Sequence, residues 1–181
     1  DYKRILEVFK KHDVRYFFYN GGNDSMDTCN KISKYMQKVG YECRVMGVPK
    51  TIDNDIWGTD VTFGFSSAME IATQCIDRMH STAASHGRTM LVEVMGNKVG
   101  WLTLYAGLAG GADMILIPEI PYDEDAVVEF LEKRRKEGAR YNIVAIAEGA
   151  LSVGEASLKR KEMAALRASR GETTATERLA R

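Results

Sequence analysis

One short polar stretch carries the residues best suited to chemistry in this 181-residue chain. Residues 49–55 read PKTIDND, so Lys50, Thr51, Asp53 and Asp55 stand close together in the sequence. Two carboxylates beside a lysine and a hydroxyl suit phosphoryl transfer: one carboxylate can take a proton from the attacking hydroxyl while another holds Mg²⁺. If the stretch is extended, its alternate residues at 51, 53 and 55 face one side. The alternative is a solvated loop rich in Asp and Asn.

Three further polar clusters each follow a predicted strand, namely GGNDS (21–25), MGN (95–97) and AEG (147–149). In the first cluster, glycines let the backbone approach a phosphate, and the free N–H groups of the next helix attract an anion. Gly22, Asp24 and Ser25 are therefore candidate donor-binding residues. The alternative is a tight turn in which Ser25 or Asp24 caps the helix.

Apolar runs alternate with helical patterns along the chain and predict an α/β fold. We expect strands at 14–20, 42–48, 89–95, 112–118 and 141–149, with helices between them. Such an order indicates a mainly parallel sheet covered by helices on both faces. Ligands bind at the carboxyl ends of strands in these sheets, so the four polar clusters are expected to converge on one edge.

Composition excludes some classes of function. Apolar residues make up 45% of the chain, enough for a core, and 25 basic residues balance 25 acidic ones. This balance gives no general attraction to nucleic acid or to a membrane surface. Cys29, Cys43 and Cys75 form no CxxC pair and no zinc spacing. An odd, scattered set is typical of reduced thiols and predicts a cytoplasmic protein.

Four single residues near the third and fifth strands are candidate ligand contacts, and each has a plain structural alternative. Arg88 can bind a phosphate or pair with an acid. Met95 and Gly96 can contact a ligand or simply end a strand. Glu148, where the fifth strand ends, can accept a hydrogen bond from a sugar hydroxyl or be an ordinary surface acid.

The character of the sequence changes after Gly149. Residues 156–172 are charged and Ala-rich, which predicts an exposed helix or a mobile insertion, and a helix with Thr caps follows. We expect residues 1–150 to be a catalytic, donor-binding α/β domain that lacks its N-terminal part. Residues 151–181 are expected to begin a second domain, so the fold is incomplete in this chain.

The stretch from Gly21 to Gly149 closely resembles the phosphofructokinase family. The segments that carry the resemblance are GGNDS, GVPKTIDNDIWGTDVTFGF, QCIDRMHSTAASHGR, VEVMGNKVGW, AGGADMILIPE and AIAEG. They occur in the family's order and at compatible spacing. The resemblance implies transfer of a phosphoryl group to the 1-hydroxyl of fructose 6-phosphate, which gives fructose 1,6-bisphosphate in glycolysis.

The resemblance also implies roles for individual residues. Asp53 would be the general base, and Thr51 and Lys50 would contact the moving phosphoryl group. Asp55 and Asn23 would lie at the Mg²⁺ site. The sugar would be contacted by Met95, Gly96 and Glu148, and its 6-phosphate by Arg88 near a subunit interface of a homodimer or homotetramer. This chain alone is expected to be inactive.

Two positions bear on the phosphoryl donor. In the family, ATP users usually have glycine at the positions of Asp24 and Lys50, whereas pyrophosphate users typically have Asp and Lys. Asp24 would repel the α-phosphate of ATP, and Lys50 would hold pyrophosphate. The resemblance therefore favours pyrophosphate, with ATP as the alternative. Asn23 and Asn97 stand where the family commonly has an acid and an arginine. A third hypothesis is therefore that the protein is a catalytically weak, regulatory subunit of the family.

Overall fold

The computed structural model describes residues 1–158, 160–171 and 174–180. The chain divides into two compact units, residues 1–64 (unit 1) and 65–181 (unit 2), and each is described by itself. The predicted parallel α/β class is confirmed. The strands nevertheless form two three-stranded parallel sheets instead of one, because strand patterns in a sequence do not specify which strands pair.

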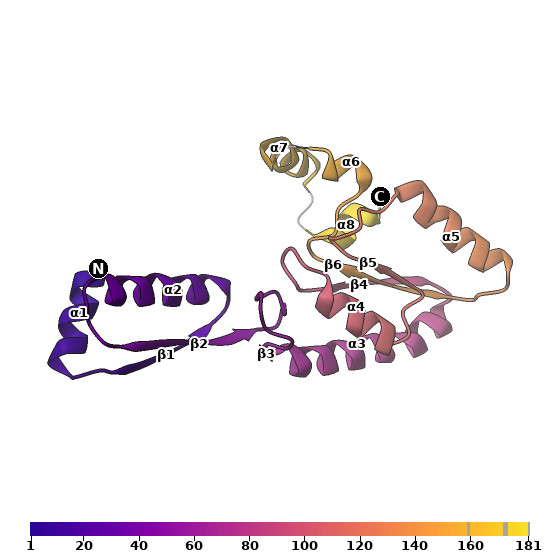
Figure 1. Cartoon of the computed structure of the whole chain (residues 1–181). Helices are drawn as coiled ribbons and strands as arrows, with labels where there is room; N and C mark the ends of the chain where they lie inside the picture. Colours follow the sequence, from indigo (N-terminus) through magenta and orange to yellow (C-terminus); the bar gives the residue numbers. More distant parts are fainter. Residues whose placement is uncertain (159, 172–173, 181) are drawn as a thin grey trace. The chain divides into compact units, whose positions relative to one another are not determined.

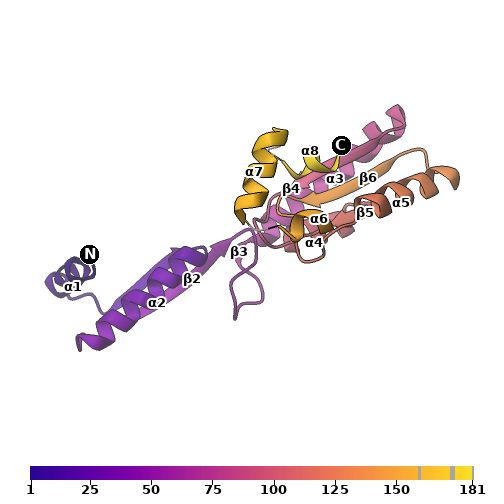
Figure 2. The same cartoon turned by 90° about the horizontal axis from the view of Figure 1, so that it is seen from above.

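Unit 1 is a small βαβ unit preceded by a helix. Its strand order is β1–β2–β3, and α2 runs along the sheet in both views (Figures 1 and 2). Its elements are α1 (Tyr2–Lys11), β1 (Tyr16–Gly21), α2 (Asn23–Lys38), β2 (Arg44–Thr51) and β3 (Phe63–Gly64). The two-residue β3 was not predicted, because so short a strand has no periodicity.

The core of unit 1 lies on one face of its sheet. Phe9, Ile32 and Met36 are buried there against Phe17 of β1 and Val45 of β2. Helix α2 approaches β2 closely at Gly47, because a Cβ on this glycine would lie only 2.5 Å from the Sδ atom of Met26 in α2. Burial also raises the pKa of the Cys29 thiol on this face, which disfavours its reactive thiolate form.

The opposite face of the unit 1 sheet is exposed. Tyr16, Phe18 and Met46 retain 70%, 65% and 54% of their accessible surface. Within the described residues, helices therefore cover only one face of this sheet. The apolar side chains that β1 carries on both faces are a pattern typical of a strand that is buried on both faces.

Unit 2 contains a three-stranded sheet in the order β4–β6–β5, with all six residues of the central strand buried. No helix among the described residues is long and apolar enough to cross a membrane. The elements of unit 2 are α3 (Phe65–His86), β4 (Thr89–Val94), α4 (Trp101–Ala109), β5 (Met114–Leu116), α5 (Glu124–Lys136), β6 (Asn142–Ala147), α6 (Val153–Ala156), α7 (Arg160–Arg170) and α8 (Ala175–Leu179).

Helices cover both faces of the unit 2 sheet, as predicted (Figure 1). Ile143 and Ala145 of β6 pack with residues of α3 and α4. Val144 and Ile146, on the other face of the strand, pack with residues of α5 and α8. This alternation fixes the register of β6, because a slip by one residue would exchange the two faces.

The C-terminal segment docks onto the sheet of unit 2. Thr176 donates hydrogen bonds to the Glu93 carboxylate from its backbone N–H (2.8 Å) and its hydroxyl (3.1 Å). The predicted Thr cap is confirmed, because Thr174 and Glu177 form a reciprocal capping box at the start of α8. The assignment of residues 151–181 to a second domain of a longer protein stays a prediction.

A buried ion pair holds α6 and α8 together. Arg178 and Glu155 are 5% and 7% exposed, their charged atoms lie 3.2 Å apart, and Arg178 also donates to the Ala150 carbonyl at 2.8 Å. We expect Arg178→Ala to lower the free energy of unfolding by about 3 kcal/mol, because the buried Glu155 carboxylate loses its nearer cationic partner and keeps only Arg167, 3.8 Å away. Urea denaturation followed by circular dichroism measures this.

The matched control is Arg4→Ala, which removes an exposed pair with Glu7 and should cost about 0–1 kcal/mol. Equal losses for the two variants would contradict the assigned role of Arg178.

Candidate active site

In unit 1, the first two polar clusters meet at the carboxyl ends of neighbouring parallel strands. Gly21 at the end of β1 pairs in register with Pro49 of β2, which sets Gly22 beside Lys50. A Cβ at Gly22 would lie 3.8 Å from the Lys50 carbonyl oxygen. The GGNDS and PKTIDND clusters therefore form one local site, as predicted for a parallel βαβ unit.

The N-terminus of α2 faces this site without a side-chain cap. Gly22 is the N-cap residue, and no side chain of the described residues caps the helix. The Ser25 hydroxyl packs instead against Gly21, where a Cβ would lie 2.1 Å from it. The capped-turn alternative is wrong, and the first-turn N–H groups remain suitable for an anion. Asp24, exposed in the same turn, opposes a bulky anion.

The loop after β2 turns back instead of running straight. Asn54 adopts φ +55°, a left-handed conformation that asparagine tolerates better than most side chains. The expectation of an extended stretch with residues 51, 53 and 55 on one side is therefore wrong. Buried Thr62 holds the turn: its N–H donates to the Asn54 Oδ1 (2.8 Å) and its hydroxyl to the Thr51 carbonyl (2.8 Å).

We expect Thr62→Val to loosen this loop, because the Thr51 carbonyl loses its buried donor. A loss of about 1–1.5 kcal/mol corresponds to roughly tenfold more frequent opening. Limited proteolysis with chymotrypsin measures the opening as cleavage after Trp57, which is 99% exposed in the loop. Thr62→Ser keeps the hydroxyl and should be cleaved at nearly the wild-type rate. Equal cleavage rates in both variants would mean that the hydroxyl does not hold the loop.

Asp53 and Thr51 are half-buried neighbours in this turn. The Asp53 backbone N–H donates to the Thr51 Oγ1 at 3.1 Å. Because the hydroxyl accepts this bond, its own hydrogen is still able to reach a phosphate oxygen. The pair therefore offers a carboxylate acceptor and a hydroxyl donor in one turn.

Asp55 is tied to the start of α2. The Asn23 Nδ2 donates to the Asp55 Oδ2 at 2.5 Å, which joins the two residues predicted at the metal site. No group of three or more His, Cys, Asp or Glu suited to a metal occurs among residues 1–158, 160–171 and 174–180. Mg²⁺ usually takes one or two carboxylates with waters and substrate phosphates, so Asp55 and the Asn23 amide oxygen are a chemically suitable pair.

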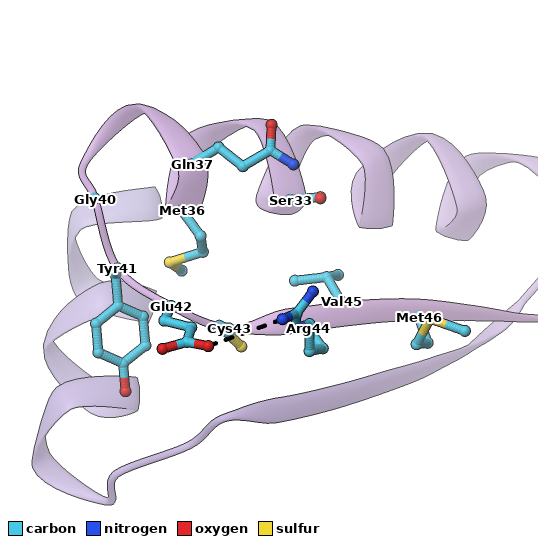
Figure 3. Close-up of a pocket in the computed structure, with 10 residues that line it drawn as sticks. All are labelled: Ser33, Met36, Gln37, Gly40, Tyr41, Glu42, Cys43, Arg44, Val45 and Met46. Carbon is cyan, nitrogen blue, oxygen red and sulfur yellow. Dashed lines mark ion pairs between the residues drawn. The ribbon is translucent and has the colours of Figure 1, made fainter.

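Unit 1 also has a hollow of about 460 Å³, and Figure 3 shows the residues that line it. The turn after α2 and the first residues of β2 line it, including the ion pair of Glu42 and Arg44 (3.8 Å). Lys50 and Thr51 are at the other end of β2, so this hollow is separate from the candidate site.

In unit 2, the MGN and AEG clusters meet at the carboxyl ends of β4 and β6. The Glu148 Oε1 accepts the N–H groups of Gly96 (3.1 Å) and Asn97 (2.5 Å). Asn97 has φ +52°, and a Cβ at Gly149 would lie 2.0 Å from its carbonyl oxygen. Glu148 thus positions the loop with one of its two carboxylate oxygens, and Met95 at the start of the loop is exposed.

Glu119 is a further anchor of this loop that the sequence did not single out. Its Oε1 accepts the Gly100 N–H at 2.8 Å, at the start of α4. The signal was present, because Glu119 follows β5 as Glu148 follows β6. Two strand-end carboxylates therefore hold the two ends of one loop.

Arg88 lies apart from the other predicted sugar contacts. It precedes β4, whereas Met95 and Gly96 follow it, and a six-residue strand spans about 20 Å. Within one copy of unit 2, the arginine and Glu148 are therefore at opposite ends of the sheet. Arg88 is exposed at its end.

Comparison with known proteins decides the family. The family model described as phosphofructokinase matches residues 1–179. The chain belongs to the phosphofructokinase family. The resemblance seen in the strand-end motifs is thereby confirmed.

Curated phosphofructokinases that resemble this chain are named as ATP-dependent. An ATP-dependent 6-phosphofructokinase of Spirochaeta thermophila is 54% identical over 158 residues, which cover 87% of this chain and 41% of that protein. ATP-dependent 6-phosphofructokinase 3 of Bacteroides thetaiotaomicron is 52% identical over 134 residues, 74% of this chain and 38% of that protein. The chain thus spans about two-fifths of the length of these relatives.

Solved phosphofructokinase structures that resemble the chain include pyrophosphate-dependent ones. The pyrophosphate-dependent enzyme of Nitrosospira multiformis has a TM-score of 0.77 and 35% identity. The match covers 84% of this chain and 41% of that one. The pyrophosphate-dependent enzyme of Marinobacter aquaeolei has a TM-score of 0.74 and 38% identity. The match covers 83% of this chain and 41% of that one. The family is the same in both groups of relatives, but the donors in their names differ.

Proposed function

We propose that the complete protein containing this chain transfers a phosphoryl group to the 1-hydroxyl of fructose 6-phosphate. The observation that carries the proposal is the joined site of unit 1, in which an uncapped helix N-terminus lies beside Lys50, Thr51 and Asp53. Family membership supports the same reaction. A location in the cytoplasm stays a prediction from the scattered cysteines.

In the proposed reaction, the Asp53 carboxylate takes the proton of the 1-hydroxyl. The hydroxyl oxygen then forms a bond to the phosphorus of the donor, and the bond from that phosphorus to the leaving phosphate breaks. The Thr51 hydroxyl and the Lys50 ammonium donate hydrogen bonds to the phosphoryl oxygens. Mg²⁺, held by Asp55 and Asn23, would neutralise phosphate charge when bound.

Pyrophosphate is the donor we propose. Asp24 stands in the first turn of α2, where its carboxylate would repel and crowd the α-phosphate of ATP. Lys50, one strand away, adds a charge that suits a small and highly charged donor. The alternative donor is ATP, favoured by the names of the curated relatives.

The sugar would be held by Met95, Gly96 and Glu148, with its 6-phosphate on Arg88 of another copy. The separation of Arg88 from Glu148 along β4 supports this division between copies. It also motivates our proposal of a homodimer or homotetramer.

The test of the proposed function is product formation by the full-length protein with Mg²⁺, both donors and one sugar phosphate at a time. We expect fructose 1,6-bisphosphate from fructose 6-phosphate and no bisphosphate from glucose 6-phosphate. Chromatography of the sugar phosphates measures both. Binding of fructose 6-phosphate without any product would instead favour a regulatory subunit, in line with Asn23 and Asn97.

A further inference from the structure

The loop that joins β4 to α4, residues 95–100, is tied down at both of its ends within unit 2. Where the loop leaves β4, the Glu148 carboxylate accepts two backbone N–H groups. At the other end, the Glu119 Oε1 accepts the Gly100 N–H at 2.8 Å. The two glutamates follow β6 and β5, which are neighbours in the sheet, so the loop is held from two adjacent strand ends.

The Gly100 end of the loop is closely packed. A Cβ on Gly100 would lie 2.4 Å from the Ile117 Cβ and 2.8 Å from the Glu119 Oε2. Both carboxylate oxygens of Glu119 therefore lie close to this glycine, and one of them accepts its N–H. Because the Gly100 backbone is buried, water cannot readily replace the carboxylate as the acceptor.

The charge of Glu119 suits its place at the start of a helix. Gly100 is the N-cap residue of α4, and no side chain caps the helix there. A carboxylate from another strand end supplies the negative charge that a helix N-terminus favours, and a hydrogen bond to a charged acceptor is stronger than a neutral one. Although Glu119 is exposed, no ion pair within residues 1–158, 160–171 and 174–180 involves it. Its contact with the loop is therefore not a by-product of a surface ion pair.

A tight turn connects Gly100 to the residues proposed to contact the sugar. The Val99 N–H donates to the Gly96 carbonyl at 3.0 Å. A Cβ on Gly96 would lie 2.4 Å from the Val99 carbonyl oxygen, so the two sides of the turn are in close contact. A displacement of Gly100 would therefore move Gly96, and with it the neighbouring Met95.

We propose that Glu119 is a positioning residue for the sugar and acts through the β4–α4 loop. Its carboxylate holds Gly100, and the turn then holds Gly96 where the sugar binds, so Glu119 acts without contacting the substrate. The identity of the sugar as fructose 6-phosphate rests on the proposed function. The candidate donor site lies in unit 1, so Glu119 is expected to affect the sugar and not the donor.

The test compares Glu119→Ala with Glu119→Gln in the full-length protein. We expect the alanine variant to raise the KM for fructose 6-phosphate about tenfold, as the loss of one hydrogen bond to a charged group does. The kcat and the KM for the donor should stay within about twofold of wild type. Glu119→Gln keeps an oxygen that accepts the Gly100 N–H, so its KM should lie within about threefold of wild type. The matched control is Glu129→Ala, which removes an exposed glutamate of α5.

A spectroscopic measurement tests the anchor without relying on catalysis. Trp101 follows Gly100 directly and is 44% exposed, so its indole reports on this end of the loop. In fluorotryptophan-labelled protein, its fluorine NMR signal is assigned by the loss of that signal in Trp101→Phe. We expect the signal to shift or broaden in Glu119→Ala without any ligand, and to keep its wild-type position in Glu119→Gln and Glu129→Ala.

The outcomes separate this proposal from the proposed function. If the wild-type protein binds fructose 6-phosphate in isothermal titration without forming product, and Glu119→Ala binds it about tenfold more weakly, the reaction is wrong and the positioning role stands. Unchanged binding and KM in Glu119→Ala, or equal changes in Glu129→Ala, would refute the positioning role. An unchanged Trp101 signal in Glu119→Ala would show that the carboxylate does not hold the loop. A wild-type protein that neither binds nor converts the sugar phosphate would refute both proposals.

Discussion

Asp53→Asn is expected to reduce the kcat of the full-length protein by about 10²–10⁴-fold, because a general base contributes that much to a proton transfer. The amide has nearly the same shape but cannot take the proton from the 1-hydroxyl. The backbone N–H of residue 53, which bonds the Thr51 hydroxyl, is unaffected. Binding of fructose 6-phosphate should therefore stay within a few-fold of wild type. Steady-state rates and isothermal titration measure the two effects.

Asp60→Asn is the matched control, because Asp60 is an exposed acid in the same loop. It should leave kcat nearly unchanged. If Asp53→Asn also keeps a kcat within threefold of wild type, Asp53 is not the base, and the mechanism proposed for unit 1 is wrong.

Asp24→Gly with Lys50→Gly is expected to change the donor. The first substitution removes the carboxylate from the anion-binding end of α2, and the second removes a cation beside it. Losing one or two charged hydrogen bonds to a phosphate corresponds to a fall of roughly 10–100-fold in kcat/KM for pyrophosphate. The kcat/KM for ATP should rise, since its repulsion by Asp24 is gone. Initial rates with each donor measure both.

Asp27→Ala with Lys31→Ala is the control for this variant. It removes an ion pair of the same net charge from the next turn of the same helix. The ratio of the two kcat/KM values should stay at its wild-type value in the control. An unchanged ratio in the Asp24 and Lys50 variant would remove the physical argument for pyrophosphate.

The order of strands and helices was largely readable from the sequence. Runs such as residues 141–149 are apolar and bounded by turns, so the predicted strand matches β6 (Asn142–Ala147) closely. The strand-end clusters were also readable, because glycine and acidic residues follow each strand. These features are local, and local patterns record which element forms and where it stops.

Pairing between distant segments was not readable. The split into two sheets, the docking of Thr176 on Glu93 and the pair of Glu155 with Arg178 all depend on contacts across many residues. The turn at Asn54 was missed for a different reason. An asparagine in a polar loop is compatible with extended and left-handed conformations, and Thr62, eight positions on, decides between them.

The place of Arg88 shows the same limit for the candidate site. Its motif predicted a phosphate contact, but only the strand direction puts it at the opposite end of β4 from Gly96.

The central claim is most directly tested by the donor comparison. The full-length protein is assayed with Mg²⁺ and fructose 6-phosphate, and formation of fructose 1,6-bisphosphate is measured with pyrophosphate and, separately, with ATP. We predict a kcat/KM at least 100-fold higher for pyrophosphate than for ATP. A higher kcat/KM for ATP would contradict the donor argument from Asp24 and Lys50, and absence of product with both donors would contradict the reaction itself.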